Sequence, residues 1–549
     1  MKTTRTRNLW LAVTAGLAFT LAAGLTLPAA AQEEKTPNMP ARNPWLADSV
    51  YPITHINSAQ TDSVLHAGPT KGRKLTAADV MTLPTVFTSN PTIKKEGGET
   101  ILIGSGVNGI RKIIATGESF KEVSFLPYPG YEATAAKGTP EAIRAVLAEA
   151  DAARRSNDEA KILALSKKMD ELGFGYKTFG DGIYNLMDKD GFHYALFGSV
   201  NIIKTTDDND PKKPIRLVKA KNVTEDLPPD LAKSVTRIIG IGMTYDGHIV
   251  AAAPGAIFLL DRDLNVKGTI TFPGEAVDNG VAVDEKGIYV VTSVRMLKLV
   301  WTGTKLSYDE ADGGWQSEYN TMSEEDSKAA GALSRGSGTT PTLMGFGDDP
   351  DKLVVISDAD KNGANLVAFW RDQIPAGFTQ KPGTKSARIA DQIRIDFSKL
   401  TLEVSPQVLG YGVTVINSTY PKPAGDIWGN AMTAGLTRPA PLGMQKLTWN
   451  PETGAFVKSW ANKEIDHTDL VVPVISAKTG MIYAAHKVSG DYQFVGLDFH
   501  TGEVKARWIF PDDSRVWNAF ASTPTLLEDG DLLIGGFFAI KRVNVGDGK

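Results

Sequence analysis

A short hairpin pattern recurs along the chain and constrains the fold more than any other feature of the sequence. "LDFHTGEVKARW" (Leu497–Trp508) joins an apolar arm, a Thr-Gly pair and a returning arm that carries a Trp. Glycine adopts turn conformations that residues with a Cβ resist, so the pair predicts a tight hairpin. "LTWNPETGAFVKSW" (Leu447–Trp460) repeats the pattern, and "LLDRDLNVKGTITF" (Leu259–Phe272) is a weaker copy that ends in Phe.

Further strand–turn–strand units lie between these hairpins, for example "NGVAVDEKGIYVVTS" from Asn279. Repeats of about 40–50 residues with four short strands each are typical of propeller blades. We therefore predict an all-β fold, an eight-bladed β-propeller, with seven blades if a terminal strand completes an earlier blade. A β-sandwich would explain the strands but not the recurring spacing from Thr-Gly to Trp. The blades are expected near 82–127, 174–222, 235–274, 276–314, 336–398, 402–460, 464–510 and 514–545.

Residues 139–173 follow a helical period and interrupt the strands. Thr139 is expected to cap the first helix, with Pro140 at its first position. Ser156–Glu159 resembles a capping box that opens a second helix, and Gly173 is expected to end that helix. This predicts a helical hairpin inserted between blades, either as a surface insertion or as a lid over one mouth of the axis.

The N-terminus has the pattern of a secretory signal. Lys2, Arg5 and Arg7 precede a long apolar stretch, and the run Ala29–Ala31 suits a signal peptidase site. We expect residues 1–31 to be a cleaved signal peptide and the protein to be periplasmic or secreted. Residues 32–80, rich in Pro, Asn and Thr, are expected to form an N-terminal arm laid over the propeller, which then occupies residues 81–549.

Composition excludes several kinds of chemistry. The chain has no Cys, which rules out covalently bound haem c, iron–sulfur clusters, thiolate zinc and Cys nucleophiles. Loss of the signal removes three basic and no acidic residues, so the formal net charge moves from −4 to −7. Such a chain carries no electrostatic signature of a nucleic-acid partner. After processing, no apolar stretch is long enough to span a membrane.

Asp498, Thr501, Gly502 and Trp508 together resemble the blade repeat of quinoprotein-type eight-bladed propellers, in which the Trp docks one blade against the next. The Leu447–Trp460 copy matches more loosely. The resemblance implies the fold, and it raises pyrroloquinoline quinone and calcium as cofactors, since the superfamily includes quinone-dependent dehydrogenases as well as non-catalytic scaffolds. This chain lacks the vicinal Cys pair common in those dehydrogenases, so the motif describes architecture rather than activity.

Propeller ligands usually bind where the loops leading into the innermost strands converge. Five such loops supply candidates here. His467 and Asp469 suit a base and the group that orients it, and Arg335 suits an anion or a polarised oxygen. Trp517 can stack on a planar ligand. The remaining candidate ligand-binding residues are Asn518, Arg515, Asn279, Asp278 and Gln407.

A separate polar turn, "SDADKNGAN", raises a metal site. Asp358, Asp360 and Asn362 are spaced like the oxygen ligands of a calcium loop. Phe369 stands where an EF-hand would have its closing Glu, so an ordinary polar hairpin turn is the alternative.

We therefore expect an exported propeller that binds a small polar or aromatic molecule at the axial mouth, with a quinone-dependent oxidoreductase as the first enzyme hypothesis. Two alternatives stand beside it: a non-catalytic periplasmic scaffold for protein partners, and a metal-dependent hydrolase or lyase. An enzyme should have a deep axial cavity lined by charge, whereas a scaffold should have a filled axis and an exposed apolar patch.

Overall fold

The structure is a computed structural model, and it describes residues 37–175, 180–330, 334–358, 360, 362–397 and 403–545. These residues belong to a compact unit that spans Pro37–Lys549, and the remaining unit is Met1–Thr36. The predicted signal peptide lies outside the described residues. Within the described ranges, no helix has the length and apolar character needed to cross a membrane.

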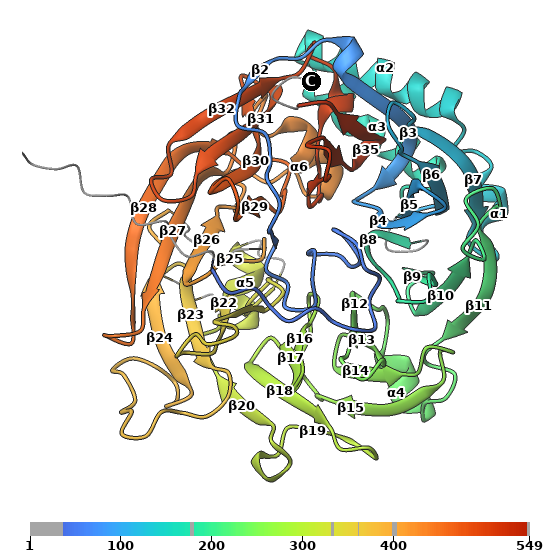
Figure 1. Ribbon diagram of the computed structural model, residues 1–549. Coiled ribbons are helices and arrows are strands. Elements are labelled where there is room, and N and C mark those ends of the chain that lie inside the picture. Colours follow the sequence, from blue (N-terminus) through green and yellow to red (C-terminus); the bar gives the residue numbers. More distant parts are fainter. Residues whose placement is uncertain are drawn as a thin grey trace, which may run out of the picture. The chain divides into compact units, whose positions relative to one another are not determined.

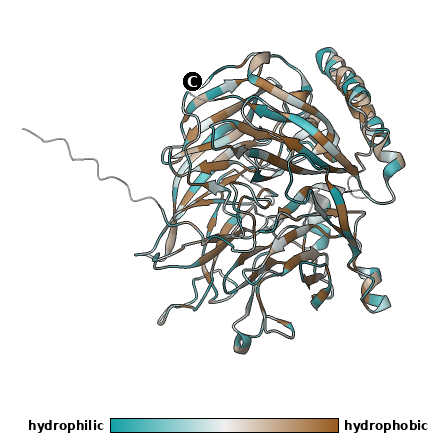
Figure 2. Ribbon diagram, turned by 45° about the vertical axis from the view of Figure 1, so that its right-hand side comes forward, coloured by the Kyte–Doolittle hydropathy of each residue, from teal (hydrophilic) through white to brown (hydrophobic). Residues whose placement is uncertain are grey.

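Short antiparallel sheets are arranged around a centre, which confirms the predicted all-β propeller (Figure 1). One four-stranded sheet consists of β8 (Gly180–Met187), β9 (His193–Phe197), β10 (Asn201–Thr206) and β11 (Arg216–Asn222). A second consists of β12 (Gly240–Met243), β13 (Ile249–Ala253), β14 (Ala256–Leu260) and β15 (Val266–Thr271). A third consists of β21 (Thr342–Met344), β22 (Leu353–Ser357), β23 (Asn365–Trp370) and β24 (Ile389–Arg394). Figure 2 shows hydrophobic segments along these strands, and the cores lie between neighbouring sheets.

Three further sheets lie around the same centre, and the first of them packs between the β12–β15 sheet and the β21–β24 sheet. The first contains β16 (Ala282–Asp284), β17 (Gly287–Val291) and β18 (Arg295–Trp301), with β19 (Leu306–Ser307) and β20 (Trp315–Glu318) both beside β18. The second contains β25 (Gln407–Leu409), β26 (Gly412–Ile416), β27 (Leu442–Asn450) and β28 (Ala455–Asp466). The third contains β29 (Val474–Ser476), β30 (Met481–Val488), β31 (Asp491–Asp498) and β32 (Val504–Ile509). In each, the strand named first lies nearest the centre among the strands named here (Figure 1).

An eight-stranded sheet joins the two ends of the propeller. It contains β33 (Thr525–Leu526), β34 (Leu532–Ile534), β35 (Gly536–Val543), β3 (Val80–Thr88), β4 (Thr92–Glu96), β5 (Glu99–Gly106), β6 (Gly109–Ile114) and β7 (Lys121–Pro127). We predicted that the first blade, near 82–127, includes the residues of β3. This is wrong, because β3 pairs with β35 along most of its length. It meets β5 through the single pair Thr88–Gly106. The number of blades stays a prediction.

The predicted docking role of Trp in the hairpin repeat is visible at Trp460. Its indole Nε1 donates to the carbonyl of Phe499, at 3.0 Å, in the neighbouring sheet. A Cβ on Gly502 would lie 2.5 Å from the Trp460 ring, so glycine is required there for contact as well as for the turn. Trp508 is fully buried.

All described α-helices lie in connections at one end of the strands, which we call the helical face. They are α1 (Glu132–Ala135), α2 (Pro140–Ser156), α3 (Glu159–Glu171), α4 (Pro229–Ser234), α5 (Glu324–Ala330) and α6 (Ile427–Thr433). The predicted helical hairpin is confirmed as α2 and α3, and Thr139 accepts a hydrogen bond from the Ala142 amide. The predicted capping box is wrong: Ser156 ends α2, and Asp158 caps α3.

The helical hairpin is not a loosely attached insertion. Ile143 and Ile162 belong to a buried cluster that also contains Trp428 of α6 and Phe537 of β35. The Trp428 indole Nε1 also donates to the Ile162 carbonyl, at 2.8 Å. The helices therefore cover part of the helical face and share a core with the strands below them.

The N-terminal arm fills the centre of the propeller instead of lying over it. It enters from the end opposite the helical face, where Asn43 donates to the Met243 carbonyl at 2.8 Å. From Tyr51 to Val64 every residue except Asn57 is buried. The arm carries β1 (Ser63–Val64), which pairs with β29, and β2 (Arg73–Lys74), which pairs with β32 (Figure 1).

Candidate functional site

The predicted base and its orienting residue lie beneath α6 rather than in an open mouth. His467 is buried, and neither of its ring nitrogens has a hydrogen-bond partner within the described part of the chain. Burial lowers the pKa of His467 to about 3, so this side chain is neutral at physiological pH. Asp469 accepts from the Ala519 amide at 2.8 Å and forms an ion pair with Lys487 at 3.0 Å. These contacts fix neighbouring loops together.

Trp517 has no open face for a ligand. Its ring stacks on Phe510 with centroids 5.1 Å apart and an interplanar angle of 6°. Its indole Nε1 donates to Asp512 at 2.6 Å. Arg515 is buried over the ring of Tyr492, with 4.5 Å between the guanidinium carbon and the ring centroid.

Three further candidates bind neighbouring backbone and side chains. Asn518 donates to the Phe537 carbonyl at 3.0 Å. Asn279 donates to the Gly338 carbonyl at 2.6 Å. Gln407 accepts from the Thr414 hydroxyl at 2.9 Å. These amides serve as internal links between the loops and strands of the helical face.

Asp278 and Arg335 lie close together in the fold but in different surroundings. Ser334 donates to Asp278 at 3.1 Å, and burial raises the pKa of this carboxyl. The Arg335 side chain remains 33% exposed and is 4.0 Å from Glu324. The structure thus brings the 467–469 loop to the 515–518 loop, and the 278–279 loop to the 334–340 loop, without gathering all the candidates in one cavity.

The residues at the axis do not fit pyrroloquinoline quinone. A tricyclic quinone needs an open slot with a free aromatic face. The Trp517 ring is already stacked, and residues 51–64 occupy the channel between the inner strands.

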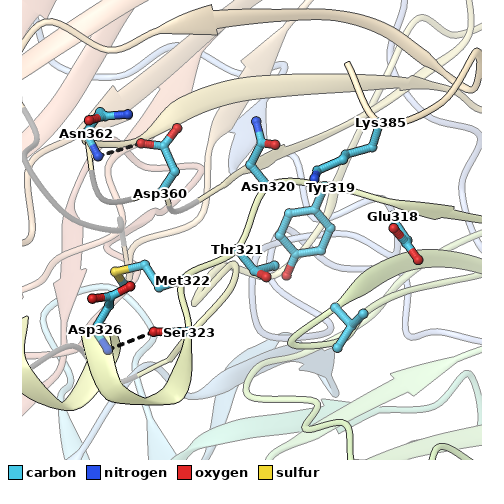
Figure 3. Close-up of a pocket in the computed structure, with 11 residues that line it drawn as sticks. Glu318, Tyr319, Asn320, Thr321, Met322, Ser323, Asp326, Asp360, Asn362 and Lys385 are labelled. Atoms are coloured by element: carbon cyan, nitrogen blue, oxygen red, sulfur yellow. Dashed lines mark hydrogen bonds between the residues drawn. The ribbon is translucent and has the colours of Figure 1, made fainter. Parts of the chain in front are cut away.

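A cavity of about 400 Å³ lies on the helical face, between the sheet of β16–β20 and the sheet of β21–β24 (Figure 3). Its lining is rich in carboxylates, amides and hydroxyls. The lining residues are Val294, Glu318, Tyr319, Asn320, Thr321, Met322, Ser323, Asp326, Asp360, Asn362 and Lys385. None of the predicted axial residues is among them, whereas two of the predicted metal ligands are.

The wall of this cavity is held in place from behind. The Tyr319 hydroxyl donates to the Thr292 carbonyl at 2.5 Å and accepts from the Ser337 amide at 2.8 Å. Ser323 accepts from the Asp326 amide at 3.0 Å where α5 begins, which turns the chain back along the cavity. Figure 3 shows Asn320 between Asp360 and Lys385.

The three predicted metal ligands do not converge. Asp358 is fully buried, and Asn365 donates to both of its carboxylate oxygens, at 2.9 and 2.8 Å. Burial raises the pKa of Asp358 to about 7 despite these hydrogen bonds. Asp360 instead faces the cavity, where Arg394 donates to it at 3.0 Å. No group of three or more His, Cys, Asp or Glu side chains suited to a metal occurs in the described ranges.

Sequence reasoning missed Glu318, Tyr319, Asn320, Asp326 and Lys385. The first four lie in "EYNTMSEED" (Glu318–Asp326), a polar run directly after a strand. The position of this run after a strand and its acidic character were the features of the sequence that could have pointed to a binding site. Its closeness to the Asp360 turn depends on how two sheets pack and has no local signature.

No protein family matches this chain. A protein of Archaeoglobus fulgidus, described as uncharacterized, is 28% identical over 334 residues. That match covers 56% of this chain and 60% of the relative, so the chain spans less than two thirds of the relative's length.

Two solved structures are similar in their propeller architecture. The quinohemoprotein alcohol dehydrogenase of Comamonas testosteroni is 11% identical, covers 93% of this chain and 82% of its own, and has a TM-score of 0.49. The quinohemoprotein alcohol dehydrogenase of Pseudomonas putida HK5 is 9% identical, covers 94% and 84%, and also has a TM-score of 0.49. Similarity at this level carries no argument about activity or cofactor.

Proposed function

We propose that this protein is an exported binding protein for a small, positively charged polar molecule, and that the ligand occupies the cavity beside α5 rather than the propeller axis. The observation that carries the proposal is the lining of that cavity. Among the described residues that line it, Glu318, Asp326 and Asp360 are carboxylates and Lys385 is an ammonium group. The signal-like sequence at the N-terminus supports export.

The charge balance favours a cation. A unit charge about 4 Å from one carboxylate gains about 4 kcal/mol at the effective dielectric near a protein surface, before the cost of desolvation. Asp360 shares its charge with Arg394, so Glu318 and Asp326 are the carboxylates less committed to a partner. The volume of about 400 Å³ is within the usual range for small-molecule sites.

The neutral lining gives the site its shape. The amides of Asn320 and Asn362 and the hydroxyl of Thr321 can orient polar groups of the ligand, while Met322 contributes apolar contact. The described lining supplies carboxylates, amides and hydroxyls that can hold a ligand, so we propose binding.

The test is a binding titration of the purified full-length protein by thermal melting and calorimetry. Putrescine is the cationic probe, with butanediol and succinate as neutral and anionic analogues of the same carbon chain. A ligand at a hundred times its dissociation constant adds about 2.7 kcal/mol to the free energy of unfolding. We expect the melting temperature to rise with putrescine and not with its analogues.

Glu318→Gln and Asp326→Asn keep side-chain size and remove the charge. We expect each to weaken putrescine binding by about tenfold, which is about 1.4 kcal/mol. Glu325→Gln is the matched control, because Glu325 is exposed beside the cavity and does not line it. Equal affinities in all three variants, or equal melting shifts for all three probes, would contradict the proposal. Calcium alone is a further probe, since Asp360 and Asn362 lie in the predicted calcium turn.

A scaffold is the second candidate, and two observations favour it: the filled axis and exposed apolar side chains on the outer strands. Val123 on β7 and Leu217 and Val218 on β11 are 40%, 41% and 40% exposed. The two strands are tied by a hydrogen bond from the Ile215 amide to Ser124, at 3.1 Å. A partner whose binding is lost in Leu217→Asp, with putrescine binding unchanged, would support this second function.

A further inference from the structure

We propose that the axial channel of this propeller is a peptide-binding site, and that residues 51–64 of the same chain are its built-in ligand. The inference concerns the axis and goes beyond the cavity beside α5. The centre of the propeller therefore recognises the backbone of a peptide and does not bind a small cofactor.

Main-chain hydrogen bonds supply most of the recognition. Inner strands of six sheets each donate one amide to a carbonyl of the segment, at 2.7 to 3.0 Å. The donor–acceptor pairs are Ile93 to Tyr51, Met187 to Pro52, Val283 to Ser58, Leu343 to Ala59, Val408 to Thr61 and Ile475 to Asp62. A peptide that adds to exposed strand edges binds in this way, through backbone groups that would otherwise be left unpaired.

Side chains set the register of the segment. The Thr54 hydroxyl donates to the Ile183 carbonyl at 2.9 Å and accepts from the Asn185 amide at 3.1 Å. His55 and Asp62 form a buried hydrogen bond, with 3.0 Å between Nδ1 and Oδ2, which closes the turn between the two limbs of the segment. Backbone amides do not distinguish one residue of the segment from the next, so these side-chain contacts fix which residue faces which strand.

The segment's backbone conformation is imposed by its surroundings. His55, Ile56, Gln60 and Asp62 all have positive φ angles, at 66°, 76°, 61° and 53°. Residues with a Cβ rarely adopt this region, and a β-branched residue such as Ile56 does so only when neighbouring contacts hold it there. Four such residues within eight positions indicate that the channel shapes the segment, as a binding site shapes a flexible ligand.

The test separates the segment from the propeller after folding. A protease site is inserted between Thr70 and Lys71, where the arm is exposed, and the folded full-length protein is cut there. We expect the cut arm to stay with the propeller in size-exclusion chromatography. The melting temperature should fall below that of the uncut protein and become dependent on protein concentration, because melting now releases a ligand. A synthetic peptide of residues 37–70 added in excess should raise it again.

Two variants examine the specificity of the channel. Thr54→Val in the cut protein should weaken retention of the arm by about tenfold, since it removes the hydrogen bonds of the Thr54 hydroxyl. Leu65→Ser is the matched control, because Leu65 is 56% exposed beyond the buried segment. The melting temperature of each uncut variant is measured first, so that a general folding defect is recognised.

Three results would overturn the inference. The first is a cut arm that elutes separately while the propeller keeps the melting temperature of the uncut protein. The second is equal retention of the arm in Thr54→Val and Leu65→Ser. The third is stoichiometric co-elution of pyrroloquinoline quinone with the intact protein in the presence of calcium, because a quinone on the axis cannot coexist with the segment.

Discussion

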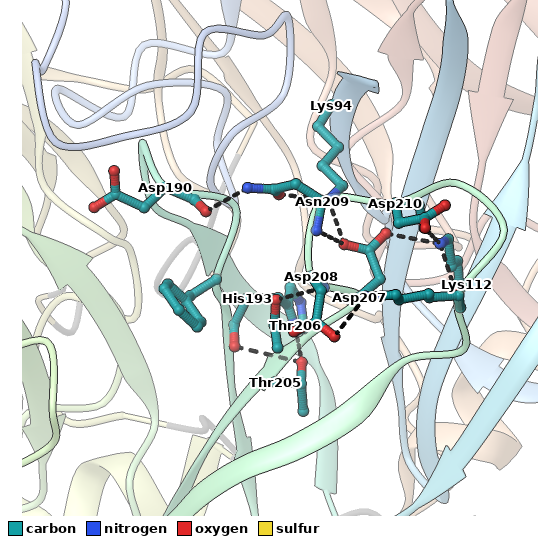
Figure 4. Close-up of polar contacts among 12 residues, drawn as sticks. Lys94, Lys112, Asp190, His193, Thr205, Thr206, Asp207, Asp208, Asn209 and Asp210 are labelled. Carbon is teal, nitrogen blue, oxygen red and sulfur yellow. Dashed lines mark hydrogen bonds and ion pairs between the residues drawn. The ribbon is translucent and has the colours of Figure 1, made fainter. Parts of the chain in front are cut away.

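Buried charged residues in this protein mainly join one sheet to the next. Asp207 lies between Lys94, at 2.5 Å, and Lys112, at 2.8 Å, and all three side chains are almost fully buried (Figure 4). Burial acts to raise the pKa of Asp207, but the hydrogen bonds from the two lysines outweigh it and hold the pKa below its ordinary value. The carboxylate thus stays ionised and links β4 and β6 to the loop before β11.

At Asp358 the effect of burial on the pKa outweighs that of the hydrogen bonds, which leads to a prediction of how the protein's stability depends on pH. Its pKa rises from an ordinary value of 3.8 to about 7, chiefly because of burial. The folded state therefore keeps a proton that the unfolded chain loses, and the stability from this group is present below about pH 4 and is lost as the pH rises to about 7. Asp358→Asn cannot titrate. We expect its free energy of unfolding, relative to the wild type, to increase by up to about 1.4 kcal/mol per pH unit across this window.

Urea unfolding at several pH values between 4 and 8 measures this difference. The absolute stability of Asp358→Asn will be offset, because an amide cannot accept both hydrogen bonds from Asn365. The prediction therefore concerns the slope with pH. Asp309→Asn, at a carboxylate 63% exposed, controls for the loss of one negative charge. Parallel profiles for wild type and Asp358→Asn would show that the buried carboxyl does not hold its proton.

At the scale of elements, local turn chemistry explains which parts of the fold could be predicted. Gly502 and Trp460 belong to neighbouring hairpins, and each hairpin carries its turn residues within a few positions of the sequence. The helical hairpin was predictable for the same reason, from its period and from the Thr139 cap. The error at Ser156 arose because Asp158, two residues later, offers an equally short acceptor for the α3 amides.

The packing of the helical hairpin gives a prediction about α2. Ile143 is buried in a core shared with β35 and α6. Ile143→Ala should lower the free energy of global unfolding by about 2–5 kcal/mol, as large-to-small changes in a core do. Arg144→Ala, one position along and 56% exposed, should leave it nearly unchanged. If Ile143→Ala loosens only the helices, seen as a local loss of helical circular dichroism with the main transition unmoved, the hairpin is an independent surface element.

At the scale of the whole molecule, sequence reasoning located the propeller but not its centre. Residues 51–64 have no apolar period, and their partners are inner strands up to several hundred positions away. The contacts are made by backbone carbonyls, which every residue has, so no side-chain pattern marks them. The axial candidates stay a prediction: His467 and Asn279 lie on loops and Gln407 lies in β25, and neighbouring residues surround each side chain.

This central segment predicts how the propeller opens. Because the segment is bonded to inner strands of six sheets, it cannot leave one strand without disturbing the others, and its release should coincide with global unfolding. The amides of Val283, Leu343, Val408 and Ile475 should therefore exchange hydrogen only at the rate set by global unfolding. Native-state hydrogen exchange with mass spectrometry in rising urea measures this, with the exposed turn at 451–453 as the rapidly exchanging reference. Inner-strand amides that exchange well before the outer strands would mean that the segment leaves the axis while the blades remain folded.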